Sequence, residues 1–547
     1  MSTICLRGGK VADGATRKVF DADVLIKDGK IAAVGATGFS ADVTYDCTGF
    51  IVTAGFADAH VHIESSMILP PAFGEAVLPH GTTFVVADPH EVVNVAGADG
   101  LKEYLGLAAD APIDVYTVLP SSVPATPLDT NGAGKFLAED MKPFLSRPDV
   151  VGLGEVMCYY DVAAGNPEIM DKIALFEGRT VDGHTAGMPE ELTAAYAAAG
   201  VKNNHECTDE EEMLRLYNAG MNVYIREGSA ARNARALLRG VKRLGLDISR
   251  FAFCTDDKHL STIAEEGHID YIVAMALEEG FGFGEAAAMA SYNPAVFYGL
   301  KNKGRVAEGY DADIVVTDGR AREIHLVFKN GELVAKDGKS VFNSAKKQNK
   351  PYVFANTVKM RELNAADFTV PESLAGVAVG LVDGQLLTTK ETLDGDEGNV
   401  NILATVERHG KNGNLSVCYL KNYGLRRGAV ATSVSHDSHN VVCAGACAED
   451  MAVACNRLRE NGGGYVVAEG GKVVDELPLA AYGLMSTAGA EETADNIARL
   501  EKCAHALGVN PAIDPFITLS FTALPVIPRL RLLDTGLYDT ETRSFIR

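Results

Sequence analysis

The stretch of sequence that decides the fold, residues 50–66, reads Phe-Ile-Val-Thr-Ala-Gly-Phe-Ala-Asp-Ala-His-Val-His-Ile-Glu-Ser-Ser. An apolar run ends at His60 and His62, and the chain then becomes polar. Successive side chains of a strand alternate between its faces, so the two imidazoles point the same way at a strand end. Neutral imidazole is a ligand for zinc, iron and similar ions, although a His-x-His pair also occurs without a metal. The pair is therefore a candidate half of a metal site.

Downstream of this stretch, short apolar runs alternate with helix-like segments, a pattern typical of parallel βα units. Eight such runs over roughly 250 residues favour an α/β fold with a TIM-type (β/α)8 barrel. A doubly wound sheet is the alternative, but no glycine-rich dinucleotide loop follows the first run. The predicted strands are Ile51–His60, Thr82–Ala87, Ile113–Leu119, Val150–Val156, Arg179–His184, Gly200–His205, Asn222–Arg226 and Phe251–Asp256.

The segments on either side of the predicted barrel have different patterns. Residues 1–50 and 300–345 carry short alternating runs with hairpin signals and predict one small β-sandwich built from both flanks of a barrel at 51–299. Residues 346–547 mix strand and helix patterns and predict a C-terminal α+β domain, with helices over 449–460 and 491–507. A lysine-rich piece at 346–351 is the expected boundary.

Composition excludes several classes of protein. A chain of 547 residues is too long for one core, and its net charge of −23 disfavours binding to nucleic acid or to an anionic membrane. The start lacks the apolar core of a signal peptide, and no window approaches a membrane span. Ten cysteines without a framework spacing predict reduced thiols and a cytoplasmic location.

Polar residues follow nearly every predicted strand at its carboxyl end, where barrel enzymes build their active sites. If these residues had no common site, a metal-type residue would have to occur by chance at the end of almost every predicted strand. The set can hold two divalent metal ions: His60 and His62 with Asp256 suit one ion, His184 and His205 suit the other, and Glu155 can bridge them. These residues are His60, His62, Asp88, His90, Glu91, Glu155, Asp182, His184, His205, Glu206, Arg226, Glu227, Asp256 and Asp257.

Such a set predicts a hydrolase. Two ions that share a hydroxide provide a nucleophile at neutral pH, and Asp256 beside it can accept a proton and pass it to the leaving group. Asp257 should face the other way and support its neighbour. The expected reaction is hydrolysis of an amide, a cyclic amide or an aminated heteroaromatic ring. Arg226 and Glu227 either pair with each other at the barrel rim or contact the substrate.

The C-terminal domain contains one unusual stretch, Ser-Val-Ser-His-Asp-Ser-His-Asn at residues 433–440. Polar density in a loop carried by a rigid sheet often belongs to a binding site. We expect this domain to close over the barrel mouth and His436 and His439 to contact the substrate, as we do for Glu91. The alternatives are a surface turn whose Asp and Asn bond their own backbone, and a third metal at His436 and His439.

The motifs together resemble the amidohydrolase superfamily and, within it, the bacterial adenine deaminase family. The resemblance covers nearly the whole chain, including the C-terminal domain. It implies a two-metal barrel (Mn, Fe or Zn) that deaminates a small-molecule purine base, adenine, with water to give hypoxanthine and ammonia, in a homodimer. The stretches that carry it are residues 55–66, 88–91, 123–127, 152–157, 182–184, 205–207, 226–233, 254–257, 309–314 and 435–440.

The resemblance also implies roles for single residues. His60 and His62 would bind one metal, and His184 and His205 the other. Glu155 would stand where many relatives use a carboxylated lysine, and Asp256 would be the proton shuttle. Asp88 and His90 match family residues close to the metals and are the other candidate catalytic residues.

Two other readings remain. A cyclic-amide hydrolase of the dihydropyrimidinase or dihydroorotase type generally carries the bridging lysine, and Glu155 counts against it. A non-catalytic scaffold of the same fold would have lost its metals, which a metal analysis of the purified protein would reveal. A cytidine-deaminase type of zinc site would need a Pro-Cys-x-x-Cys pair, and the sequence has none.

Overall fold

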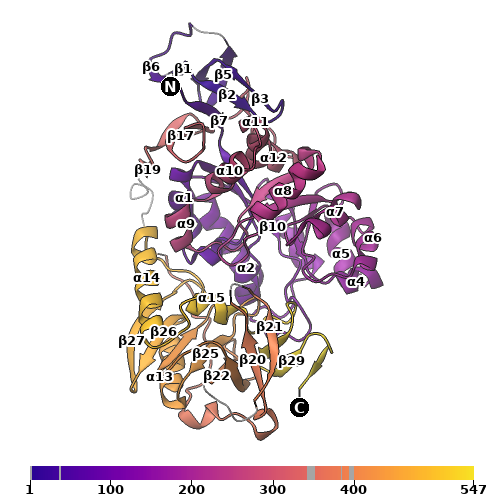
Figure 1. The fold of residues 1–547 in the computed structure, drawn as a ribbon, viewed down its shortest axis with the longest axis vertical. Helices are drawn as coiled ribbons and strands as arrows, with labels where there is room; N and C mark the ends of the chain where they lie inside the picture. The colour runs from indigo at the N-terminus through magenta and orange to yellow at the C-terminus, as the bar shows by residue number, and fades with distance from the viewer. Residues whose placement is uncertain (1–2, 36–37, 342–351, 384, 394–399, 547) are drawn as a thin grey trace.

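The computed structural model describes residues 3–35, 38–341, 352–383, 385–393 and 400–546. Three parts follow one another along the long axis of the molecule (Figure 1): a β-sandwich at one end, the barrel in the middle and the C-terminal domain at the other end. The boundary predicted at 346–351 lies outside the described residues.

Parallel strands form the predicted (β/α)8 barrel. Five of them pair in the order β12-β11-β10-β9-β8 and three in the order β13-β14-β15. Backbone hydrogen bonds close the ring on both sides, from Asp256 N to His60 O at 3.0 Å and from Lys202 N to Val181 O at 2.8 Å. The strands are β8 (Phe56–Val61), β9 (Thr82–Ala87), β10 (Asp114–Leu119), β11 (Val150–Val156), β12 (Thr180–Gly183), β13 (Asn203–Asn204), β14 (Asn222–Arg226) and β15 (Phe251–Cys254).

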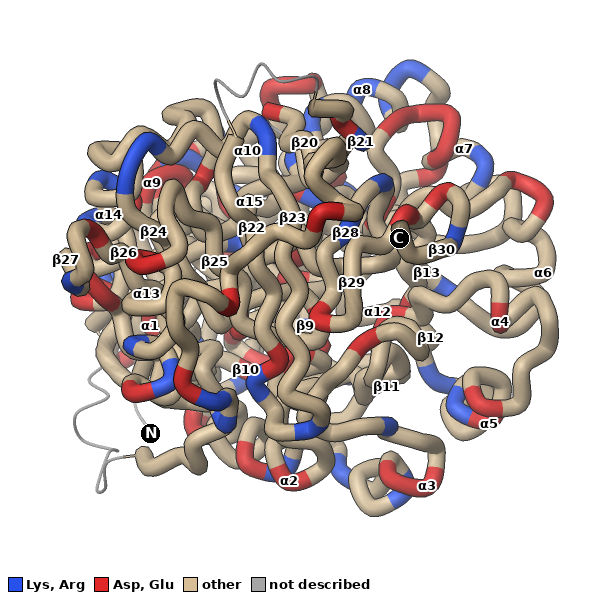
Figure 2. Tube along the Cα trace, turned by 90° about the horizontal axis from the view of Figure 1, so that it is seen from below, with Lys and Arg blue, Asp and Glu red and all other residues tan. Residues whose placement is uncertain are grey.

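Helices cover the outside of the barrel (Figure 1). Seen from below, their acidic and basic residues are interspersed, as in α5 and α7 (Figure 2). Among the described residues, no helix combines the length and the apolar character that a membrane crossing needs. The helices are α1 (Pro70–Val77), α2 (His90–Ala109), α3 (Ala138–Met141), α4 (Tyr159–Ala164), α5 (Pro167–Leu175), α6 (Thr193–Ala198), α7 (Glu210–Asn218), α8 (Ala234–Leu244), α9 (Leu260–Glu266), α10 (Ile269–Glu278), α11 (Phe283–Ala287) and α12 (Asn293–Phe297).

The first predicted strand, Ile51–His60, is wrong as a single element. The structure divides it at Gly55 into β7 (Ile51–Ala54) in the sandwich and β8 in the barrel. A Cβ atom on Gly55 would lie 2.1 Å from Thr83 Oγ1, and the amide of Gly55 donates to Asp313 O at 2.9 Å. Only glycine fits this crossing point between two sheets, so the barrel sheet begins at residue 56 rather than 51.

The sandwich is built from both flanks of the barrel. One sheet has the order β5-β4-β1-β6, and the other, β19-β18-β17-β16-β7-β2-β3, joins N-terminal strands to strands after residue 313. Their buried residues, such as Leu6, Val24 and Phe328, form one apolar cluster. The strands are β1 (Ile4–Arg7), β2 (Lys10–Asp13), β3 (Lys18–Asp21), β4 (Asp23–Lys27), β5 (Lys30–Gly35), β6 (Val43–Asp46), β16 (Ile314–Thr317), β17 (Ile324–Lys329), β18 (Glu332–Lys336) and β19 (Lys339–Ser340).

The C-terminal domain is an α+β unit around a sheet with the order β21-β20-β23-β22-β25-β24-β26-β27. One face packs under α13, and the other joins the apolar cluster shared with the barrel. The predicted helices at 449–460 and 491–507 correspond to α13 and α14. The elements are β20 (Val377–Leu381), β21 (Thr388–Thr392), β22 (Val400–Val406), β23 (Leu415–Lys421), β24 (Ala429–Thr432), β25 (Val441–Gly445), α13 (Ala448–Asn461), β26 (Gly464–Glu469), β27 (Lys472–Pro478), α14 (Ala490–Ala506), α15 (Pro515–Ser520), β28 (Leu530–Leu533), β29 (Gly536–Asp539) and β30 (Ser544–Phe545).

Candidate metal centre and substrate pocket

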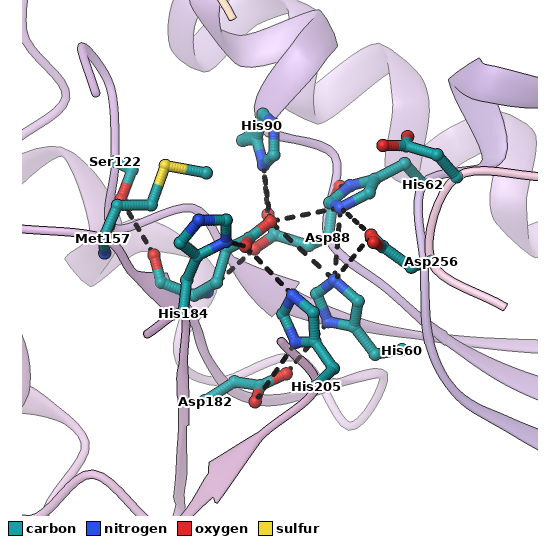
Figure 3. Close-up of polar contacts among 12 residues, drawn as sticks. His60, His62, Asp88, His90, Ser122, Met157, Asp182, His184, His205 and Asp256 are labelled. Atoms are coloured by element: carbon teal, nitrogen blue, oxygen red, sulfur yellow. Dashed lines mark hydrogen bonds and ion pairs between the residues drawn. The ribbon is translucent and has the colours of Figure 1, made fainter. Parts of the chain in front are cut away.

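Five histidines converge on one point at the carboxyl ends of the barrel strands (Figure 3). They come from the ends of three barrel strands and from the first residue of α2, and all are buried. The sequence therefore brought the metal-type residues of distant strands to one place, as barrel topology requires. They are His60, His62, His90, His184 and His205.

The carboxylate of Glu155 lies between two groups of these histidines. Its Oε1 is 3.1 Å from His62 Nε2 and 3.7 Å from His60 Nε2. Its Oε2 is 2.8 Å from His184 Nδ1 and 3.3 Å from His205 Nε2. Each oxygen thus faces one pair of imidazoles, which is the arrangement expected of a ligand that bridges two ions.

The outer nitrogens of the first pair fix which nitrogens face the centre. His60 Nδ1 donates to Asp182 Oδ2 at 2.9 Å, and His62 Nδ1 donates to the carbonyl of Asp88 at 2.9 Å. Each Nε2 is therefore left with a lone pair directed at the centre, 3.1 Å from the other. Metal-ligating histidines almost always donate their second N–H in this way, so these residues fit a bound metal.

Charge at the centre also fits cations. Burial raises the pKa of Glu155, but its contacts with His184, His205, His62 and His90 hold the pKa well below its usual value. The carboxylate is ionised among imidazoles that would be neutral as metal ligands, and a buried ion of this kind needs a compensating charge. Groups of histidine and carboxylate atoms close enough to share one ion occur on both sides of Glu155.

Asp256 occupies a strained position directly above β15. Its φ of 58° lies in the left-handed region, which non-glycine residues rarely adopt. The backbone is held there by bonds from its amide to His60 O and from the His62 amide to its carbonyl. As a result Oδ1 lies 3.1 Å from His62 Nε2, while Oδ2 accepts from Arg226 Nη1 at 2.7 Å. Burial raises the pKa of Asp256, but His62 and Arg226 hold the pKa well below its ordinary value.

Asp88 lies behind the centre and is absent from the cavity lining. Its Oδ2 accepts from the amide of Glu155 at 3.0 Å, and a Cβ atom on Gly154 would come within 2.1 Å of the same oxygen. Ser121 and Ser122 donate their hydroxyls to the Glu155 carbonyl at 2.6 and 2.8 Å. Asp88 therefore orients the strand that carries Glu155.

A cavity opens in front of the histidines. Both the barrel and the C-terminal domain line it. Its polar side includes six carboxylates, Glu91, Glu155, Glu206, Asp256, Asp257 and Asp437, and one arginine, Arg226. Four apolar residues of the C-terminal domain also line it and are here called the apolar wall: Leu386, Phe521, Leu524 and Ile527.

The polar loop of the C-terminal domain meets the barrel at Glu91. His436 Nδ1 lies 2.7 Å from Glu91 Oε1, and His439 Nε2 contacts Glu91 Oε2. His90 Nε2 is 3.7 Å from Asp437 Oδ1. The loop is thus buried over the barrel mouth and is not a surface turn.

The tautomer of His439 disfavours a third metal at this contact. The backbone amide of Ser435 donates to His439 Nδ1 at 3.1 Å, so Nδ1 carries a lone pair and Nε2 carries the proton. Nε2 then donates to Glu91 and has no lone pair for an ion. This arrangement is the reverse of the one at His60 and His62.

Among the predicted substrate contacts, Glu227 lies away from the others. Its Oε2 accepts from the amide of Ala234 at 3.1 Å, and it is absent from the cavity lining. Arg226, by contrast, lines the cavity and contacts Glu206 as well as Asp256. Alternation along the chain sends the two neighbours in opposite directions.

Sequence reasoning assigned no role to several residues of the site. Asp182 and Glu206 stood at strand ends and could have been found by that signal, and Asp437 lay inside the noted polar loop. The apolar wall gave no signal, because its residues are ordinary apolar residues of a distant domain.

Comparison with known proteins gives matches along the whole chain. The amidohydrolase family matches residues 51–334, and the adenine deaminase C-terminal domain matches residues 382–544. The chain is 38% identical to adenine deaminase 2 of Carboxydothermus hydrogenoformans over 99% of the chain and 96% of that relative. It is 39% identical to the adenine deaminase of Desulfitobacterium hafniense over 100% of the chain and 96% of that relative. The structure of a dihydropyrimidinase from Brevibacillus agri matches 62% of the chain and 96% of its own, at 16% identity and a TM-score of 0.48.

Proposed function

We propose that this chain, which belongs to the adenine deaminase family within the amidohydrolases, hydrolyses adenine to hypoxanthine and ammonia. The observation that carries the proposal is the match over the entire chain, including the C-terminal domain, which supplies six of the nineteen residues that line the cavity. Two full-length relatives bear the name adenine deaminase, and a hydrolase of this type needs the buried histidine and carboxylate set described above.

We infer that two divalent ions, manganese, iron or zinc, bind on either side of Glu155. His60 and His62 with Glu155 Oε1 would hold one ion, and His184 and His205 with Glu155 Oε2 the other. When bound, the ions acidify water so that a nucleophile is available at neutral pH. The choice among metals depends on availability as much as on ligands, since mixed histidine and carboxylate sites accept several ions.

Asp256 would move the proton. Its Oδ1 faces the centre, while Arg226 holds Oδ2, so one oxygen is free to accept a proton from the attacking water. The same oxygen would deliver that proton to the amino nitrogen, which departs as ammonia while the ring carbon gains the oxygen. Glu206 contacts Arg226 Nη1, the nitrogen that also donates to Asp256, and Arg226 Nη2, and would keep the guanidinium in place.

The rest of the cavity would orient the base. The apolar wall offers a flat, desolvated surface to one face of the purine ring. Glu91, His90, Asp437 and His436 lie around the cavity rim and can exchange hydrogen bonds with ring nitrogens. A pocket that combines polar groups with an apolar wall suits a free base better than a polymer.

The test is ammonia release from a panel of free purines and cyclic amides, with the metal content measured on the same sample. We expect turnover of adenine by metal-loaded protein and no opening of dihydropyrimidines. Metal-replete protein that opens a cyclic amide but releases no ammonia from adenine would refute the proposal. Protein that holds no metal after growth in metal-supplemented medium would indicate the non-catalytic scaffold.

The proposal also includes the oligomeric state and the location of the protein. A homodimer is supported by the family resemblance, and sedimentation of the purified chain at assay concentration tests it. A cytoplasmic location is supported by the ten cysteines, all free thiols, seven of them buried. Thiols in this state are typical of a reducing compartment.

A further inference from the structure

Arg531 is a fully buried arginine of β28 with no carboxylate partner among the described residues. Its guanidinium instead donates to four backbone carbonyls. Nε donates to Ile527 O at 2.8 Å, Nη1 to Phe521 O at 2.7 Å, and Nη2 to Leu386 O at 2.9 Å and to Pro528 O. A guanidinium has five N–H donors in a rigid plane, so this single side chain can serve several carbonyls at once.

Three of these four carbonyls belong to the apolar wall of the cavity. Leu386, Phe521 and Ile527 line the cavity with their side chains and direct their carbonyls to Arg531, whereas Arg531 does not line the cavity. Leu524, the fourth wall residue, lies within the same loop. The wall therefore consists of two separate chain segments whose backbones meet at one cation.

Physical reasons explain why such a wall needs a cation behind it. Residues 521–528 and the segment before β21 are irregular, so sheet and helix bonds leave some of their carbonyls unpaired. A buried carbonyl without a donor destabilises the fold. Arg531 satisfies these carbonyls together and, in doing so, sets the distance between the two segments. Burial lowers the pKa of Arg531 to about 9.

We propose that Arg531 is a positioning residue that holds the apolar wall against the flat face of the purine and so determines affinity for the base. This inference rests on the proposed function. Arg531 acts through Leu386, Phe521 and Ile527 and does not touch the reacting atoms. Asp256 and Glu155, which the proposed chemistry uses, belong to the barrel, whereas the wall belongs to the C-terminal domain.

The proposal predicts a particular kinetic signature. The wall contacts the face of the ring, which stays in place while the amino-bearing carbon is attacked, so the wall binds ground state and transition state alike. Loss of such uniform binding raises KM and leaves kcat nearly unchanged. A residue needed only for folding would instead lower the amount of active enzyme without changing KM.

The experiment compares Arg531→Met, Arg531→Lys and wild type as metal-loaded, full-length protein. We expect Arg531→Met to raise KM for adenine about tenfold or more with kcat within about threefold. Arg531→Lys keeps the charge and three donors and should recover part of the affinity. Ile527→Ala, which truncates the wall directly, should raise KM in the same way, and the double variant should be less than additive because both changes affect one wall.

Arg408→Met is the matched control. Arg408 is also fully buried in the C-terminal domain, but its guanidinium has no hydrogen-bond partner among the described residues and does not line the cavity. We expect its KM to stay within about twofold of wild type, since no wall segment depends on it. Equal rises of KM in both arginine variants would show a general effect of losing a buried cation and would overturn the proposal.

Hydrogen exchange provides a readout that does not depend on adenine turnover. Amides of residues 521–528 should exchange faster in Arg531→Met than in wild type, with barrel strands such as β11 unchanged. If wild type fails to deaminate adenine, the proposed function falls and this exchange result still decides whether Arg531 holds the wall. If wild type is active but Arg531→Met keeps both its KM and the exchange of this loop, the inference about Arg531 is wrong.

Discussion

The two ends of the barrel both bury carboxylates, but they balance the charge differently. At the sandwich end, Asp114, Asp311 and Asp313 surround Lys303, with Nζ–O distances of 2.6, 2.9 and 2.7 Å. Lys329 adds contacts of 2.8 Å to Asp114 and 2.9 Å to Asp313, and Lys30 contacts Asp311. At the opposite end, six carboxylates line the cavity beside one arginine.

The comparison shows what distinguishes a structural cluster from a functional one in the same barrel. Three lysines neutralise three aspartates at the sandwich end, so that cluster is complete without a ligand. At the cavity end one arginine lies among six carboxylates, and divalent ions held by neutral imidazoles would supply further positive charge. Changes at the cavity end should therefore alter turnover, and changes at the sandwich end should alter stability.

The largest effect is expected at Glu155. Glu155→Ala removes the carboxylate shared by both histidine pairs, so we expect loss of metal and a decrease in kcat/KM beyond the roughly 10⁴-fold limit for losing one general acid or base. Metal analysis together with adenine kinetics tests this expectation. A variant that retains two ions per chain and normal turnover would show that Glu155 is not a metal ligand.

The next effect separates two neighbouring aspartates. Asp256→Asn removes the proton acceptor but leaves the histidines, and we expect kcat to fall about 10²- to 10⁴-fold with metal retained. The expectation that Asp257 faces away from the centre is wrong, because it lines the cavity and offers a ligand atom within 4.8 Å of those of His62 and Asp256. Asp257→Asn should still have a smaller effect, because Asp257 accepts from Ser65 Oγ. Steady-state kinetics of both variants checks the order. A more damaging Asp257 variant would reverse the assignment.

At the sandwich end, Lys303→Met tests the other half of the comparison. Three carboxylates would lose a common partner that is only 7% exposed, and we expect unfolding to become easier by about 3–5 kcal/mol. The adenine KM and kcat of the folded protein should stay unchanged at 25 °C. Denaturant unfolding and kinetics on one preparation measure both. A variant of normal stability would show that the cluster contributes little.

The same cluster should make stability depend on acid. Burial raises the pKa of Asp114, but Lys329 and Lys303 lower it by more, so the net pKa is below its usual value. The pKa of Asp311 is likewise lowered by Lys30 and Lys303 despite its burial. Groups with lowered pKa values stabilise the fold above their unfolded pKa of about 3.9, and this stabilisation is lost as pH falls toward the folded values. Unfolding free energies measured from pH 5 downward should therefore fall less steeply in Lys303→Met than in wild type.

The smallest effect is expected at Glu227. Glu227→Gln keeps an oxygen that can accept from the Ala234 amide, and the side chain lies outside the cavity lining. We expect KM and kcat to change by less than about twofold, as for substitutions away from special features. A large rise in KM would show that Glu227 contacts the substrate.

Sequence patterns predicted the barrel well where local signals were strong. β9, β11 and β14 have the predicted bounds, because a polar or glycine residue marks at least one end of each run. The pattern missed the division at Gly55, since an apolar run looks the same whether one sheet or two sheets bury it. The histidines could be found because strand ends in a barrel meet in space. The apolar wall and Arg531 could not, because their meaning depends on packing between distant segments.

The pairing of β7 with β16 has a consequence for synthesis of the protein. Residue 51 pairs with residue 317 and residue 54 with residue 314, so the sheet is completed only after the whole barrel has been translated. Until then β7 presents an unpaired edge in the nascent chain, and open edges recruit other strands. The N-terminal strands therefore lack their partner β16 until more than 200 further residues have been synthesised. A chain that terminates before β16 should aggregate, even though it contains every predicted metal ligand of the barrel.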